Sequence, residues 1–157
     1  MEKKVSYTLS EAISKMEAFC AYQERCHKEV IERLRHMNMI PISIDHIMGH
    51  LIEHNFLNEQ RFARSFARGK FSIKKWGKKR IVNELKLRGI SKYNIQEALK
   101  EIPETEYYQT FNNLAQKKFD ALTDTNQLKK KKKLIDYLLY RGWEPAMVYE
   151  KAYELIP

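Results

Sequence analysis

The sequence feature that constrains the fold most is a weak internal repeat with a period of about 51 to 53 residues. In each copy, two adjacent apolar residues are followed, three positions after the second, by a leucine. The three copies of this pattern are Val30-Ile31 with Leu34, Ile81-Val82 with Leu85, and Leu134-Ile135 with Leu138. Repetition on this scale is the signature of an array of similar structural units.

The spacing within each copy indicates helices, because apolar residues three and four apart share one helix face. Gly89 and Gly142 occupy the position where helices commonly end in a left-handed residue, and Asn38 takes that position in the first copy. A leading helix completes each copy. We expect the leading helices to begin at Thr8, Asn58 and Thr105, and the last helices at Ser43, Ser91 and Glu144-Pro145.

These patterns predict an all-α fold of three tandem three-helix, helix-turn-helix-like units. The expected units are residues 8–54, 55–102 and 103–157. Each unit is too small to bury its apolar face alone, so neighbouring units should pack in an elongated array. Five glycines and four prolines are too few for a fold rich in strands and turns. A single compact helical bundle is the alternative.

The composition favours a polyanionic partner. The net charge is +9, which suits nucleic acid or an anionic membrane surface. No apolar run is long enough to span a bilayer, and the first residues lack an apolar signal core. We therefore expect a cytosolic protein that does not bind membranes. Its two cysteines, Cys20 and Cys26, match no zinc spacing and are expected to be reduced and packed in the interior.

Positive charge is concentrated in the middle unit, where residues 55–102 hold 13 lysines and arginines against 4 acidic residues. No acidic residue lies between Arg61 and Asn83, and three arginines of this stretch share one stripe of a predicted helix. Lysines gather where the next helix begins, and again in the third unit, although cations there oppose the helix dipole. The candidate partner- and DNA-binding residues are Arg61, Arg64, Arg68, Lys70, Lys74, Lys75, Trp76, Lys78, Lys79, Arg80, Lys130, Lys131 and Lys132.

Each of these features has a plainer alternative. The lysine run 129–133 could be a solvated helix face with no ligand. Trp76 and Phe71 could stack on exposed bases, or could be buried between helices.

The sequence contains no pattern typical of catalysis, and we expect neither an enzyme nor a cofactor, metal or small-molecule substrate. It has no phosphate-binding glycine loop and none of the common zinc motifs. Three histidines spaced four apart are interpreted as a half-exposed stripe, and two pairs of carboxylates as ordinary helix surface. These residues are His46, His50 and His54, Asp120 with Asp124, and Glu150 with Glu154.

The middle segment resembles the RecX family. The motif elements stand in order: Phe56-Leu57-Asn58, Arg61-Phe62-Ala63, a basic stretch, a joint at Gly77, then Arg80-Ile81, Glu84-Leu85 and Arg88-Gly89-Ile90. In the first unit, Tyr22 and Arg25 fall on the family motif, and Tyr140 to Trp143 resemble the end of the family's C-terminal unit. The departures are Cys26-His27, Asn38 in place of glycine, and Trp76-Gly77 in place of Gly-Pro.

The resemblance implies a modulator, usually an inhibitor, of the RecA recombinase in homologous recombination, DNA repair and the SOS response. Family members consist of tandem three-helix units that lie in the groove of the filament formed by RecA and single-stranded DNA. The alternative is a stand-alone helix-turn-helix protein that binds nucleic acid. Against it, the candidate recognition helix 91–102 is not basic and has few side chains suited to reading bases.

Overall fold

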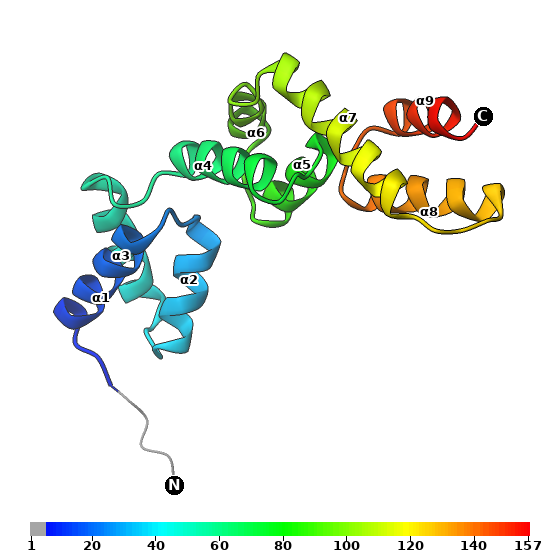
Figure 1. Cartoon of the computed structure of the whole chain (residues 1–157). Helices are drawn as coiled ribbons and strands as arrows, with labels where there is room; N and C mark the ends of the chain where they lie inside the picture. The colour runs from blue at the N-terminus through cyan, green and yellow to red at the C-terminus, as the bar shows by residue number, and fades with distance from the viewer. Residues whose placement is uncertain (1–5) are drawn as a thin grey trace, which may run out of the picture.

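The computed structural model describes residues 6–157, which form nine α-helices and no strand. The chain runs from one end of an extended molecule to the other, with three helices in each successive group (Figure 1). The helices are α1 (Leu9–Tyr22), α2 (His27–His36), α3 (Pro41–Glu53), α4 (Glu59–Ser72), α5 (Lys78–Leu87), α6 (Lys92–Leu99), α7 (Glu104–Ala121), α8 (Gln127–Tyr140) and α9 (Pro145–Leu155). The predicted all-α array of three-helix units is confirmed, and the compact bundle is not found.

Helix packing follows the three groups. Helix α3 packs on α1 and α2, helices α4, α5 and α6 pack on one another, and so do α7, α8 and α9. The repeated apolar residues lie in these interiors, since Val30, Ile81 and Leu134 are all fully buried. We propose the boundaries 54/55 and 102/103 for the three units, called here units 1, 2 and 3.

The predicted helix ends are largely confirmed. Asn38, Gly89 and Gly142 all have a positive φ, of 59°, 74° and 93°. Three predicted N-caps are confirmed: Thr8, Asn58 and Ser91. The side chain of each accepts a hydrogen bond from the backbone N–H three residues on.

Two predicted helix starts are wrong by a few residues. Helix α3 begins at Pro41 rather than after Ser43, because proline at the first helical position already has a helical φ and needs no N–H partner. Helix α7 begins at Glu104, directly after the extended Pro103, rather than at Thr105.

The interior is divided into two hydrophobic cores. One belongs to unit 1 and includes Met16, Leu34 and Ile47. The other is continuous through units 2 and 3, from Phe62 to Ile156. Cys26 is the residue of unit 1 that joins this second core, where it is fully buried. Both cysteines are buried thiols that form no disulfide, as predicted.

Units 2 and 3 meet through backbone hydrogen bonds as well as through their core. The Gly77 N–H donates to the Arg141 carbonyl at 2.8 Å, and the Lys79 N–H donates to the Gly142 carbonyl at 3.0 Å. The Lys78 N–H donates to the Tyr107 hydroxyl at 2.9 Å. The first N–H groups of α5, which no side chain of unit 2 caps, are therefore satisfied by unit 3.

The tyrosine at this joint is held in a fixed protonation state. The Tyr107 hydroxyl donates to the Glu144 carboxylate, with O–O distances of 2.8 and 2.6 Å. Burial and this hydrogen bond raise the pKa of Tyr107 well above its ordinary value. The hydroxyl therefore keeps its proton and can serve both Lys78 and Glu144 over the whole physiological pH range.

Units 1 and 2 meet through charged groups as well as apolar ones, since Cys26 of unit 1 lies in the second core and Leu57 of unit 2 lies in the first. The Arg61 guanidinium lies 2.6 Å from Glu24 and also donates to the backbone carbonyls of the connection between α3 and α4. His27 contacts Glu59 at 2.9 Å, and Lys28 donates to the Leu87 carbonyl at 3.1 Å. Burial at this joint raises the pKa of Glu59, and the neighbouring His27 opposes that shift.

Candidate nucleic-acid interface

The structure divides the predicted binding residues by whether a carboxylate neutralises them. Arg61 is paired with Glu24, as described above. Arg64 and Arg68 face helix α6: Arg64 lies 3.8 Å from Glu97 and 3.7 Å from Glu101, and Arg68 lies 3.2 Å from Glu101. The prediction that no acid balances these three arginines is therefore wrong, because the balancing carboxylates come from distant parts of the sequence.

The predicted lysines differ in the same way. Lys132 lies 2.9 Å from Asp136, one turn along α8. Of the remaining predicted cations, none has a carboxylate of residues 6–157 within 4 Å. These unpaired cations are Lys70, Lys74, Lys75, Lys78, Lys79, Arg80, Lys130 and Lys131. The first six stand on or beside the connection from α4 to α5, where units 2 and 3 meet.

Arg80 is the centre of a stack of aromatic and cationic side chains. Its guanidinium lies 4.2 Å from the centre of the Trp76 ring and 4.7 Å from that of Tyr140. It also donates to the Tyr140 carbonyl at 3.2 Å. The Lys70 ammonium lies over the other end of the stack, 5.0 Å from the centre of the Trp76 ring. Contacts of this kind fix the cations in place without neutralising them. We call Lys70, Trp76, Arg80 and Tyr140 the cation–aromatic platform.

The aromatic residues differ in what they can offer a ligand. Tyr140 is 75% exposed. Trp76 is half-buried and packs edge-on against Phe66 at 6.3 Å. Phe71 is buried against Tyr107, so it cannot stack on a base as one sequence hypothesis had it. Tyr140 is thus the ring with the most free surface for stacking on an unpaired base.

Tyr140 was missed by sequence reasoning because it belongs to the nearly neutral third unit. Nothing in the spacing of the chain places it beside Arg80, which lies 60 residues away. The one available signal was its position directly before Arg141-Gly142, the residues whose carbonyls bind the start of α5. Tyr140 and Gly142 border a shallow hollow of about 440 Å³, which Lys79, Arg80, Asn83 and Glu84 also help to line.

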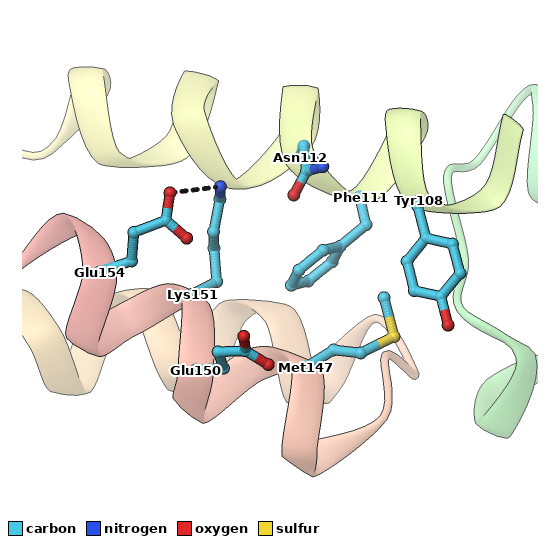
Figure 2. Close-up of a pocket in the computed structure, with 7 residues that line it drawn as sticks. All are labelled: Tyr108, Phe111, Asn112, Met147, Glu150, Lys151 and Glu154. Carbon is cyan, nitrogen blue, oxygen red and sulfur yellow. Dashed lines mark hydrogen bonds and ion pairs between the residues drawn. The ribbon is translucent and has the colours of Figure 1, made fainter. Parts of the chain in front are cut away.

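A second hollow, between α7 and α9, contains the predicted carboxylate pair Glu150 and Glu154 (Figure 2). It has a volume of about 220 Å³, with Phe111 and Met147 at its apolar end. Figure 2 shows Lys151 reaching from α9 toward α7, and its ammonium lies 3.2 Å from the Glu154 carboxylate. An ion pair between two residues of the same helix is common on helix surfaces, which agrees with the interpretation of Glu150 and Glu154 as ordinary surface.

The candidate metal ligands are not brought together. No cluster of three or more His, Cys, Asp or Glu side chains with metal-binding geometry occurs among residues 6–157. The rings of His50 and His54 stack on each other at 4.3 Å, and His50 lies 3.6 Å from Glu17. In the same part of the chain, no helix has both the length and the apolarity that a bilayer span requires.

Two family models match consecutive segments of the chain, one in unit 2 and one in unit 3. The model of the second three-helix domain of RecX matches residues 58–99, and that of the third three-helix domain matches residues 104–151. Two solved structures share the fold. One, the crystal structure of RecX from Lactobacillus salivarius, is 24% identical with a TM-score of 0.78, and covers 94% of this chain and 96% of that one. The other, the crystal structure of a regulatory protein RecX, is 20% identical with a TM-score of 0.80, and covers 93% and 71%.

Curated relatives extend the match in sequence. The regulatory protein RecX of Serratia proteamaculans (strain 568) is 38% identical over 103 residues, and that of Yersinia enterocolitica (serotype O:8 / biotype 1B) is 36% identical over the same length. Each alignment covers 66% of this chain and 60% of the relative. The family models, the relatives and the shared fold agree, and the chain belongs to the RecX family.

Proposed function

We propose that this protein inhibits the RecA recombinase by binding filaments of RecA on single-stranded DNA, and so modulates recombination and DNA repair. The observation that carries the proposal is the group of unpaired cations where units 2 and 3 meet, in a chain of a family whose relatives are named regulatory proteins. We propose that the protein acts by binding in the cytoplasm, without catalysing a reaction.

The cations suit the phosphates of a nucleic acid strand. Six of them come from residues 70–80, and the platform holds two of these, Lys70 and Arg80, in fixed positions. Binding that neutralises about four to six phosphates of a single strand releases counterions, so log affinity should fall against log salt with a slope of about −3 to −4. The elongated shape would let the flanking units contact the protein part of the filament.

The arginine stripe is proposed to play a different part from that of the unpaired lysines. Because Arg64 and Arg68 are paired with acids in α6 and just beyond its end, a ligand would have to compete with Glu97 and Glu101 for them. We expect them to contribute less to binding than Lys70 and Lys79, although they carry the same charge.

The test is the DNA-dependent ATP hydrolysis of the cognate RecA, measured while this protein is titrated at less than one copy per RecA. We expect strong inhibition by the wild-type protein. The double variant Lys70→Glu/Lys79→Glu should lose most of it. The double variant Lys15→Glu/Lys92→Glu, which changes the net charge equally at exposed sites away from the interface, should keep it.

Circular dichroism of both variants shows whether each remains folded. Inhibition that survives in the folded Lys70→Glu/Lys79→Glu variant would contradict the assigned surface. Tight binding to bare DNA with no effect of the wild-type protein on RecA would instead favour the stand-alone nucleic-acid-binding protein.

A further inference from the structure

A second basic groove, lined by other residues, lies at the joint between units 2 and 3. Its volume is about 390 Å³, and three segments line it: the connection from α4 to α5, the C-terminal half of α7, and the end of α8. Five of the nine lining residues are cations and none is acidic. The lining residues are Ile73, Lys74, Lys75, Leu114, Lys117, Lys118, Ala121, Tyr137 and Arg141.

The cations of this groove are positioned by their neighbours. The Arg141 guanidinium donates to the Lys74 carbonyl and lies 5.0 Å from the centre of the Tyr137 ring. Lys118 lies over the same ring at 4.7 Å. Lys75, whose backbone has a φ of 59°, donates to the Ser72 carbonyl at 2.7 Å. These contacts position three of the five cations: Arg141, Lys118 and Lys75.

No carboxylate in residues 6–157 lies within 4 Å of any of the five cations. Five like charges around one hollow repel one another and produce a positive potential that a polyanion would relieve. Two other lysines of α8 do have acidic partners: Lys132 pairs with Asp136, and Lys133 pairs with Asp124. The absence of acids is therefore a property of the groove and not of the whole of α8.

The groove is separate from the cation–aromatic platform. The hollow beside the platform and this groove share no lining residue. A strand bound along Tyr140 would leave Tyr137 and Arg141 free for a different ligand.

We infer that this groove binds the sugar–phosphate backbone of a second nucleic acid strand, so that one molecule holds two strands at once. The inference rests on the proposed function, in which the platform binds the first strand. A volume of about 390 Å³ is at the lower end of ligand pockets and suits a stretch of about one nucleotide.

The chemistry of the groove favours a phosphate strand over an acidic protein surface. Four of the five cations are lysines, which bind phosphate as point charges, while carboxylates are bound best by arginines with both nitrogens available. The one arginine is already engaged with the Lys74 carbonyl. The groove also offers no buried polar group to read a base, so a backbone fits it better than a free nucleotide.

The test is a two-strand capture assay with the full-length protein. One thymidine oligonucleotide is fixed on beads and a second, fluorescent one is in solution. We expect the wild-type protein to retain the fluorescent strand. The groove variant Lys117→Gln/Lys118→Gln should retain at least tenfold less, while its affinity for a single short oligonucleotide falls no more than about threefold. The control Lys15→Gln/Lys92→Gln removes two exposed lysines elsewhere and should behave as the wild type does.

Each contrary outcome has a separate meaning. Undiminished capture by the folded groove variant overturns the inference, as does capture that sedimentation shows to require a dimer. Loss of RecA inhibition with capture unchanged also overturns it, and assigns the groove to a protein partner. Failure of the wild-type protein to inhibit RecA counts against the proposed function, whereas capture that depends on the groove would still support two strand sites.

Discussion

At the scale of the residue, the partner of a charged side chain decides what that side chain can do. Arg64 and Lys70 lie on the same helix and carry the same charge. The first is paired with Glu97 and Glu101, while the second lies over Phe66 and Trp76 and keeps its charge available. Exposed ion pairs contribute little to stability but do reduce the potential that a ligand meets.

The same scale explains why glycine is required where units 2 and 3 meet. A Cβ atom on Gly142 would lie 2.5 Å from the Arg80 nitrogen and 2.8 Å from the Arg80 Cα, in a residue whose φ is already 93°. Gly89 has a similar φ of 74°, but a Cβ atom there would meet open space. The two glycines therefore share a backbone conformation and differ in their surroundings.

This difference gives a matched prediction. Gly89→Ala should lower the free energy of unfolding by about 1–2 kcal/mol, the cost of a left-handed alanine. Gly142→Ala should lower it by about 3 kcal/mol or more, because the steric conflict with α5 adds to that cost. Urea denaturation followed by tryptophan fluorescence measures both. Equal losses in the two variants would show that the contact between Gly142 and Arg80 is unimportant.

At the scale of the element, the helix N-termini of units 2 and 3 are satisfied in different ways. The first N–H groups of α5 bind the Arg141 and Gly142 carbonyls and the Tyr107 hydroxyl. Helix α8 is capped locally by the Asn126 side chain, which accepts from the Lys129 N–H at 3.1 Å. Five lysines then follow within its first two turns, where they oppose the helix dipole.

This arrangement predicts that α8 can be made more stable at the expense of binding. Lys129→Glu places an acid at the third helical position, beside the Asn126 cap, and should stabilise the protein by about 0.3–1 kcal/mol. The same change should weaken binding to single-stranded DNA, since it adds a negative charge beside Lys130. Thermal unfolding and fluorescence anisotropy measure the two effects. An increase in stability with unchanged affinity would remove the lysine run from the binding surface.

At the scale of the whole molecule, the two cores and the two joints indicate unequal coupling between units. Units 2 and 3 share one core and a set of backbone hydrogen bonds. Unit 1 has its own core, which Leu57 of unit 2 joins, and it meets unit 2 through Cys26 and the pairs Arg61–Glu24 and His27–Glu59. We therefore expect unit 1 to unfold independently and units 2 and 3 to unfold together.

The tryptophans make this expectation measurable, because Trp76 and Trp143 both belong to units 2 and 3. Heating should give a single transition by tryptophan fluorescence. Far-ultraviolet circular dichroism, which detects all the helices, should show an additional transition at a different temperature. Arg61→Ala should separate the two further by weakening the joint. Coincident curves from the two methods would show that the three units unfold as one.

The sequence by itself determined the architecture, because that information is local. The spacing of Val30, Ile81 and Leu134 with their neighbours specifies helix faces, and Asn38, Gly89 and Gly142 specify where helices end. Such signals depend only on residues within a few turns of one another. The exceptions were small: Ser43 and Thr105 were displaced as helix starts by nearby prolines whose fixed φ decides the matter first.

Only the tertiary structure decided which charges are available for binding. The acids that neutralise Arg61, Arg64 and Arg68 lie 33 or 37 residues away along the chain, and no sequence pattern links them. The same is true of Tyr140 beside Arg80, and of Lys117 and Lys118 beside Lys74. Electrostatic interactions depend on distance in space and not on separation along the chain. The net charge therefore predicted a polyanionic partner, while the fold alone placed the cations that could bind it.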